Sequence, residues 1–231
     1  MNQQNQLQRP TEYRFTGRII AGLCFIAVFI LIAWLVVHGK TQVIDNRVRF
    51  FAYSTRTPVS EHILVPITYL ANKYFIVTAV AVLLAVPRTR KEFGVPVGIS
   101  SALALVPYKL LKTSIARPRP NPAMWLVAEH GYSFPSGHSM NGMIFYAMLI
   151  FLIQRSNLSR YKKNVLSVVF GLLIPLIGFS RLFCGVHYVS DVLGGLSIGI
   201  AWVLLFSCLI DLWRQKTSGK NKSRISYKKH A

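Results

Sequence analysis

The sequence predicts an all-α membrane protein, built as a bundle of six transmembrane helices. Two observations lead to this prediction. Only 15% of the 231 residues are charged and 52% are hydrophobic, whereas soluble domains carry about 25% charged residues. In addition, six apolar runs approach the length of about 20 residues that a helix needs to cross a bilayer. These runs exclude a disordered chain, and they exclude a soluble nucleic-acid-binding domain in spite of the net charge of +20.

The six predicted spans use roughly half of the chain and leave no room for a separate soluble domain. They cover residues 19–37, 67–86, 93–111, 136–153, 165–184 and 188–210. The first is too long for the apolar core of a signal peptide and lacks a small-residue cleavage site after it, so we expect it to be retained. The second contains Asn72 and Lys73, which we place in its first two turns, where a lysine can extend to the headgroups. We therefore expect one membrane domain over residues 1–212.

Two segments outside these spans have a recognisable composition. Residues 213–231 are basic and contain no acid, which predicts a disordered cytoplasmic tail that helps to orient the protein. Docking of this tail to anionic lipid or to nucleic acid is the alternative. Residues 44–53 suit a short helix on the outer membrane surface, although a plain loop fits nearly as well. The three cysteines are odd in number, and two of them lie inside apolar runs, so a disulfide scaffold is excluded.

Basic residues are distributed unevenly between the two sides of the predicted bundle. The segments on the side of the N-terminus contain 17 Lys and Arg residues, and those on the other side contain 8. Because cytoplasmic segments are enriched in these residues, we expect both termini in the cytoplasm. The polar residues at the outer ends of the spans are Lys112, Arg117, Arg119, Ser136, His138, Arg181, His187 and Asp191. Ionisable groups near the membrane are costly, so this cluster indicates a functional site.

The charges in the outer cluster favour a compact oxyanion, above all phosphate, because guanidinium forks and a lysine point charge bind it well. Residues 135–138, Pro-Ser-Gly-His, open the fourth span. A proline suits a first helical turn, the free N–H groups there attract anions, and glycine allows close approach to the backbone. The alternative is a metal site made of His138, His187 and Asp191. We reject it because the neighbouring cations would repel a metal ion, and we expect neither metal nor cofactor.

Two histidines of the cluster suit the chemistry of phosphate transfer. His187 and Asp191 are four residues apart and share one face where helical geometry holds. The carboxylate can fix the tautomer of the ring and leave the other nitrogen as a nucleophile. His138 comes from a different span, so it can protonate the leaving oxygen from the opposite side. Taken alone, a His-x3-Asp pair is weak evidence, because in most helices it has a structural role.

Together these residues resemble the three signature motifs of the type 2 phosphatidic acid phosphatase superfamily. The motifs read Lys112-x6-Arg119-Pro120, Pro135-Ser136-Gly137-His138 and Ser180-Arg181-x5-His187-x3-Asp191. Arg117 also precedes a proline, but the spacing from Lys112 selects Arg119. The resemblance covers nearly the whole chain except the tail. The short six-span form resembles bacterial members that act on phosphatidylglycerophosphate or undecaprenyl diphosphate, which implies a bacterial plasma membrane.

The resemblance implies metal-independent hydrolysis of a lipid phosphomonoester or diphosphate through a phosphohistidine. The substrate would be phosphatidylglycerophosphate, undecaprenyl diphosphate or phosphatidic acid. By the same resemblance, His187 is the nucleophile, Asp191 its partner and His138 the acid. The residues that would hold the phosphate are Lys112, Arg119, Ser136, Gly137 and Arg181. The expected partners are the lipid substrate and the bilayer, not nucleic acid, and the site should face the extracytoplasmic side.

Two other functions are left open by the sequence. The phosphohistidine could pass its phosphate to another lipid, which would make the protein a phosphotransferase. The basic cluster could also be the selectivity site of a transporter or anion pore. A pore would need polar residues through the centres of the spans, whereas the ionisable residues of this cluster stop at the outer ends. Measuring the release of inorganic phosphate separates the first alternative from hydrolysis.

Overall fold

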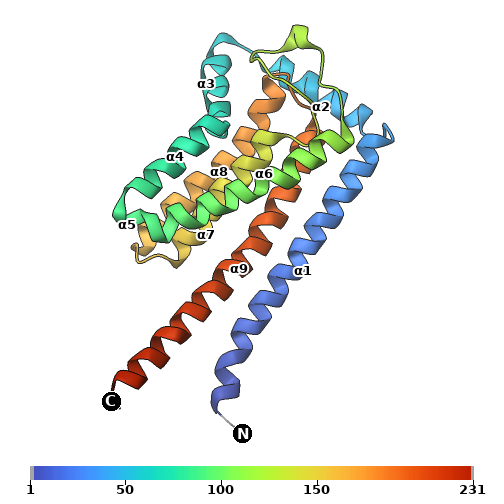
Figure 1. The fold of residues 1–231 in the computed structure, drawn as a ribbon. Coiled ribbons are helices and arrows are strands. Elements are labelled where there is room, and N and C mark those ends of the chain that lie inside the picture. Colours follow the sequence, from blue (N-terminus) through green and yellow to red (C-terminus); the bar gives the residue numbers. More distant parts are fainter. Residues whose placement is uncertain (1–2, 230–231) are drawn as a thin grey trace.

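The computed structural model describes the backbone of residues 3–229 and the side chains of residues 15–215, and all regular structure in this part is helical (Figure 1). The α-helices are α1 (Gln3–Val37), α2 (Gln42–Ser54), α3 (Pro58–Tyr69), α4 (Lys73–Ala85), α5 (Pro87–Thr89), α6 (Val95–Ile115), α7 (Gly137–Arg155), α8 (Arg160–Phe183) and α9 (Val189–Lys229). A π-helical turn, Arg90–Gly94, joins α5 to α6, and a 3-10 turn, Pro122–Met124, lies between α6 and α7. The predicted all-α fold is confirmed.

Four helical stretches of the described chain are long and apolar enough to cross a membrane. They are Phe15–Val37, Pro87–Ile115, Arg160–Phe183 and Val189–Gln215. The pair α3 and α4 forms a fifth candidate, bent by 55° at its break. Five of the six predicted spans therefore coincide with candidate spans, and the protein is a multi-pass helical bundle.

The second predicted span, residues 67–86, is not one straight helix. α3 begins well before it, because the side chain of Thr57 caps its first turn. α4 begins at Lys73, after the side chain of Asn72 accepts a hydrogen bond from the backbone N–H of Tyr74 at 3.0 Å. Asn72 and Lys73 thus mark the junction of two helices, and not the first turns of one. An asparagine inside an apolar run can start a new helix by capping it, and the apolar pattern does not distinguish the two cases.

α7 lies inside the bundle, between three neighbouring helices. It packs against α6, α8 and α9, and one row of its side chains, four residues apart, is at most 1% exposed: Met140, Ile144, Met148 and Leu152. Its bounds lie within two residues of the predicted span 136–153. Its composition does not place it among the candidate spans of the described chain. A helix that neighbouring helices shield from lipid can carry more polar residues than a lipid-facing one.

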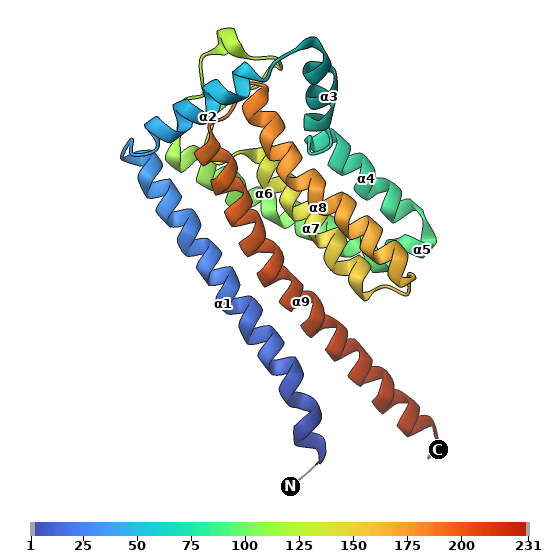
Figure 2. The same cartoon turned by 180° about the vertical axis from the view of Figure 1, so that it is seen from behind.

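The two ends of the bundle differ in structure. α1 packs along α9, and both chain ends lie at one end of the molecule (Figures 1 and 2). There Arg18 of α1 and Arg155 of α7 both pair with Asp211 of α9, with N–O distances of 2.7 and 3.0 Å. α2 crosses the opposite end, where the sequence predicted a short helix at residues 44–53 (Figure 1). The loops from α6 to α7 and from α8 to α9 also lie at that opposite end.

The predicted tail, residues 213–231, does not begin at a break in the structure. α9 continues to Lys229, so the described backbone of this segment is helical where we predicted disorder. A helix that is already formed extends at little cost into residues of good helix propensity such as Lys, Arg and Gln. Residues 230–231 lie outside the described part of the chain. What the basic charges of the tail bind stays a prediction.

Candidate active site

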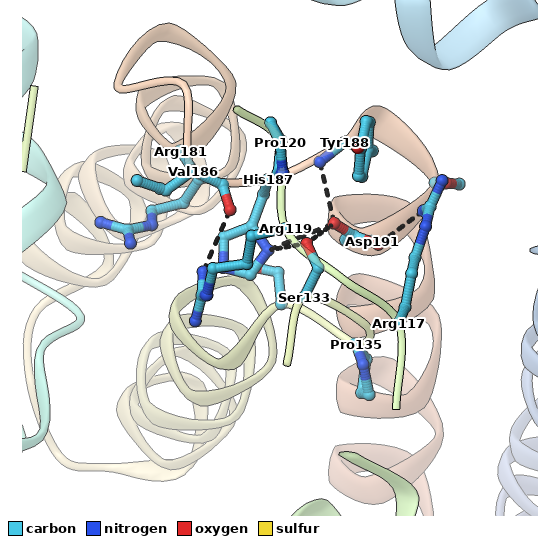
Figure 3. A network of polar contacts seen from close by, with 12 residues as sticks. Arg117, Arg119, Pro120, Ser133, Pro135, Arg181, Val186, His187, Tyr188 and Asp191 are labelled. Atoms are coloured by element: carbon cyan, nitrogen blue, oxygen red, sulfur yellow. Dashed lines mark hydrogen bonds and ion pairs between the residues drawn. The ribbon is translucent and has the colours of Figure 1, made fainter. Parts of the chain in front are cut away.

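The predicted site residues lie together at the end of the bundle that α2 crosses (Figures 1 and 3). They come from three segments: the end of α6 with the loop after it, the start of α7, and the end of α8 with the start of α9. The α8–α9 connection brings His187 and Asp191, and the loop after α6 brings Arg117 and Arg119 (Figure 3). Hydrogen bonds and ion pairs join these segments, as the alternation of the predicted spans requires.

His187 is held between a carboxylate and a guanidinium group. Its Nδ1 lies 3.3 Å from Oδ2 of Asp191, and its Nε2 lies 3.2 Å from Nη1 of Arg119. An arginine can only donate, so Nε2 accepts and the ring proton lies on Nδ1, toward Asp191. His187 is 1% exposed, and this burial lowers its pKa to about 3, although Asp191 acts in the opposite direction. The ring is therefore neutral near pH 7, with the lone pair of Nε2 facing the basic cluster.

Asp191 is fixed by more partners than the sequence predicted. Its Oδ2 accepts from the backbone N–H of Tyr188 at 2.8 Å and from the hydroxyl of Ser133 (Figure 3). The oxygen of Ser133 also lies 3.3 Å from Nδ1 of His187. Ser133 and Asp191 are both fully buried. Because each buried acceptor of Asp191 is satisfied, the carboxylate has one orientation toward the ring.

Arg117, which the motif spacing set aside, contacts Asp191 directly. Its Nη1 donates to Oδ1 of Asp191 and its Nη2 to Oδ2 of Asp45, both at 2.7 Å. Asp45 comes from α2, is 1% exposed, and also accepts from the backbone N–H and the hydroxyl of Ser190. Burial acts to lower the pKa of Arg117, but the two carboxylates raise it above its ordinary value. Arg117 therefore neutralises two buried carboxylates and supports the His187–Asp191 pair.

Arg119 lies on the other side of His187. Apart from His187, its guanidinium donates to the backbone carbonyls of Gly131, His130 and Val186, at 2.9 to 3.0 Å. These contacts tie the loop before α7 to the loop before α9. Its side chain is 6% exposed, and burial lowers its pKa below the ordinary value of an arginine. The motif residue Arg119 therefore lies beside Nε2 of His187.

Glu129, which the sequence analysis did not name, joins three of the basic residues. Its Oε2 lies 3.3 Å from Nη2 of Arg119, and its Oε1 forms an ion pair with Nη2 of Arg181. The same Oε1 lies 3.8 Å from Nδ1 of His138. Arg181, from α8, is 1% exposed and also donates to the hydroxyl of Thr68 at 2.6 Å. The structure thus brings together Arg119, Arg181 and His138 around one carboxylate.

The start of α7 differs in detail from the prediction. Ser136 is the N-cap, so Pro135 precedes the helix and does not lie in its first turn. The hydroxyl oxygen of Ser136 accepts from the backbone N–H of Ser139 at 3.4 Å, which makes this side chain the helix cap, and also from the hydroxyl of Ser139 at 3.0 Å. A Cβ at Gly137 would collide with the hydroxyl of Tyr108, so close packing against α6 requires glycine there. The first N–H groups of α7 still point out of the helix, as every helix start requires.

Lys112 reaches the same helix start from α6. Its Nζ donates to the carbonyl of Pro135 at 3.4 Å and lies 5.1 Å from the ring centre of Tyr108. The predicted phosphate-binding residues Lys112, Gly137 and Arg181 are therefore all near the His138 end of the cluster. Among the residues whose side chains are described, no group of three or more His, Cys, Asp or Glu side chains could hold a metal ion.

Two of the site residues that the sequence alone did not reveal, Asp45 and Glu129, carried one signal. Asp45 and Glu129 are two of only seven acidic residues in a chain with 27 Lys and Arg. An acid in such a chain, close to a basic cluster at the membrane, is a candidate ion-pair partner. Its partner could not be named, however, since Asp45 and Arg117 are 72 residues apart in the chain. Ser133 carried no such signal.

The fold and the motifs agree with comparisons to known proteins. The family model "PAP2 superfamily" matches residues 93–215. Phosphatidylglycerophosphatase B of Bacillus subtilis is 32% identical over 195 residues, which are 81% of this chain and 95% of that protein. Undecaprenyl-diphosphatase of Sulfolobus acidocaldarius is 27% identical over 189 residues, 79% of this chain and 86% of that protein. The crystal structure of a transmembrane PAP2-type phosphatidylglycerolphosphate phosphatase from Bacillus subtilis superposes with a TM-score of 0.73 at 28% identity, over 84% of this chain and 96% of that one.

Proposed function

Since this chain belongs to the PAP2 superfamily of membrane lipid-phosphate phosphatases, we propose that it hydrolyses phosphatidylglycerophosphate through a phosphohistidine formed on His187. The observation that carries the proposal is the position of the His187 ring. Asp191 holds its Nδ1, and Nε2 faces Arg119 at 3.2 Å. The nitrogen that would attack phosphorus therefore lies beside a cation that can bind the phosphate oxygens.

The proposed reaction has two steps. First, the lone pair of His187 Nε2 attacks phosphorus, the bond from phosphorus to the lipid oxygen breaks, and that oxygen takes a proton from His138. Second, His138 accepts a proton from water, the water oxygen attacks phosphorus, and the phosphorus–nitrogen bond breaks. Inorganic phosphate leaves, and His187 is neutral again. Asp191 accepts from Nδ1 throughout and stabilises the positive charge that the ring gains.

The basic residues would neutralise the phosphate oxygens in the transition state. Arg119 and Arg181 supply guanidinium forks, Lys112 a point charge, and the first N–H groups of α7, at Gly137 and His138, complete the site. This much fixed positive charge does what a metal ion does in other phosphatases, so we propose a metal-independent reaction. Ser136 contributes through the helix start that it caps, which positions Gly137 and His138.

The lipid chain has a suitable place next to this site. A cavity of about 260 Å³ lies between α4, α6 and α7, and residues such as Ile76, Val80 and Leu105 line it. Asn141, which also lines it, is one helical turn below His138. We place the first part of an acyl chain there. The comparisons support phosphatidylglycerophosphate over undecaprenyl diphosphate. The phosphatidylglycerophosphatase is 32% identical, and the match covers 95% of its length, whereas the undecaprenyl-diphosphatase is 27% identical, with 86% of its length covered.

The proposal includes α7 as a sixth crossing and a site on the extracytoplasmic face. α7 passes through the bundle between α6 and α8, and the chain ends lie opposite the site (Figure 1). The excess of Lys and Arg on the side of the termini supports a site on the outside by the positive-inside rule. A cysteine at Asn121, in a chain without its three native cysteines, should react with an impermeant thiol reagent in intact cells. Labelling only after lysis would reverse the orientation.

The reaction is tested with the purified full chain and vesicles that contain phosphatidylglycerophosphate. We expect one inorganic phosphate per lipid consumed, with no loss of rate in a metal chelator. His187→Ala should abolish the release and keep the elution profile of the folded protein. Transfer of the phosphate to a second lipid in place of its release would make the protein a phosphotransferase. Activity that a divalent metal restores after chelation would contradict the metal-independent reaction.

A further inference from the structure

The carboxylate of Glu129 lies where the proposed function places the phosphate. It forms an ion pair with Arg181, lies 3.3 Å from Nη2 of Arg119 and 3.8 Å from Nδ1 of His138. These are two of the cations assigned to the phosphate and the histidine assigned to the leaving oxygen. One anionic side chain of the protein therefore makes three of the contacts that the proposed function assigns to the substrate.

The contacts of Glu129 leave part of this basic site unused. Nε of Arg181 is buried and has no hydrogen-bond partner among the described residues. A flat carboxylate has two oxygens, whereas a phosphate group presents at least three, arranged around a tetrahedron. A phosphate can therefore satisfy donors that Glu129 leaves unpaired, and an unpaired buried donor is costly. The site suits the larger anion better than it suits the carboxylate.

The side chain of Glu129 can leave the site while its backbone stays in place. The side chain is 19% exposed and that of His138 is 16% exposed, whereas Arg181 and Arg119 are buried at 1% and 6%. Glu129 thus lies at the open side of the site. The adjoining backbone is held, because Arg119 donates to the carbonyls of His130 and Gly131 at 3.0 and 2.9 Å. Rotation about the side-chain bonds of Glu129 is enough to open the site.

We infer that Glu129 is an internal competitor for the phosphate subsite, and this inference rests on the proposed function. In the free protein its carboxylate pairs with Arg119 and Arg181. The substrate phosphate displaces it, and after hydrolysis it returns and helps to expel inorganic phosphate. A competitor that is always present lowers the apparent affinity for every phosphate. The competition weakens the binding of lipid phosphate and of free phosphate by the same factor. A lipid also binds through its buried chains, so it can still occupy the site at concentrations at which free phosphate no longer does.

The test measures the binding of inorganic phosphate to the detergent-purified full chain by titration calorimetry, which needs no turnover. Glu129→Gln keeps the size of the side chain and removes the competing charge. We expect its Kd for phosphate to be at least tenfold lower than that of the wild type, a gain of about 1.4 kcal/mol. Glu129→Ala should also lower the Kd for phosphate. Glu61→Gln removes one negative charge from the first turn of α3, at the same end of the molecule, and should leave the Kd unchanged.

A merely structural role of Glu129 predicts the opposite result. If the carboxylate served only to position Arg119 and Arg181, both variants would bind phosphate more weakly. Unchanged or weaker binding in the two Glu129 variants would overturn the inference. An equal gain in phosphate affinity in Glu61→Gln would also overturn the inference. The effect would then come from the net charge of this end of the molecule, and not from the position of Glu129. If the wild type hydrolyses lipid phosphate while Glu129→Gln binds phosphate no more tightly, only this inference fails. If the wild type hydrolyses none, the proposed function fails, and the inference with it.

Discussion

Arg117 and Arg119 are two residues apart and lie in opposite kinds of surroundings. The partners of Arg117 are the carboxylates of Asp45 and Asp191, which are 1% and 0% exposed and both 2.7 Å away. The one carboxylate beside Arg119, that of Glu129, is 3.3 Å away and 19% exposed. The first region is a closed network, in which removal of any partner leaves a buried charge. In our proposal, the second is a cation site whose anion can be exchanged. The basic cluster of the sequence would then contain a part that fixes the histidine and a part that is available to the substrate.

The largest effect is expected from the exchangeable region. Arg119→Ala should lower kcat/KM for a lipid phosphate about 10³-fold, because it removes a charge that stabilises the transition state. Arg119→Lys should restore little of this kcat/KM, since one ammonium group cannot replace the two-pronged hydrogen bonding of a guanidinium group. The apparent Tm should fall by less than in Arg117→Ala, because three backbone carbonyls lose a donor but no buried carboxylate loses its cation. Initial rates and thermal unfolding of the same preparations check this. Near-normal kcat/KM in Arg119→Ala would show that Arg119 is not a phosphate ligand.

In the closed network, a substitution should lower stability and kcat and leave KM nearly unchanged. Arg117→Ala leaves Asp45 and Asp191 buried without their cation, so we expect a loss of about 3–5 kcal/mol in unfolding free energy. We expect kcat to fall about 100-fold, because Asp191 no longer has one orientation, while KM stays within about twofold. Steady-state kinetics and chemical denaturation measure these quantities. A variant with raised KM and normal stability would place Arg117 in the substrate site and remove the distinction between the two regions.

Asp45→Asn is a milder change in the same network. Arg117 keeps its bond to Asp191, so we expect kcat to fall only about fivefold to tenfold and stability to fall by about 2 kcal/mol. A double-mutant cycle with Arg117→Ala should show coupling, because the two side chains contact each other. Asp211→Asn, at the other end of the bundle, is the matched control and should leave kcat unchanged. Additive effects of Asp45 and Arg117 would contradict the network.

The smallest effect concerns His187, which both regions contact. Its pKa is lowered to about 3 in the folded protein, against about 6.5 in an unfolded chain. Below pH 6.5 the unfolded state binds a proton that the folded state does not, so stability falls as the pH falls toward 3. Between pH 7 and pH 5 this loss is about 2 kcal/mol. The apparent Tm of the wild type should therefore drop more over this range than that of His187→Gln. An equal fall in Tm for the wild type and for His187→Gln would show that His187 is not buried in its neutral form.

Some features of the fold follow directly from local sequence, and others do not. The bounds of α7 lie within two residues of the predicted span because the apolar run ends at polar residues on both sides. The predicted span at residues 67–86 contains the break between α3 and α4, because Asn72 starts α4 as a cap, and a pattern of apolar residues does not reveal a cap. The tail was predicted to be disordered from its basic charge and low apolar content, whereas the described backbone of α9 continues as a helix to Lys229. The composition of a segment indicates whether it lies in lipid or in water more reliably than it indicates where a helix begins and ends.

The sequence by itself determined the membrane class, the helical fold and the motif residues, because these depend on composition, periodicity and spacing within short segments. It also placed those residues at one end of the bundle, since alternating spans bring their connections to the same side. Only the tertiary structure decided that Arg117 pairs with Asp45 and Asp191, and that Glu129 lies between Arg119 and Arg181. These pairs join α2, the loop before α7, the end of α8 and the start of α9. The reach of an ion pair is a few ångströms in space, and no spacing along the chain encodes which distant segments come within it.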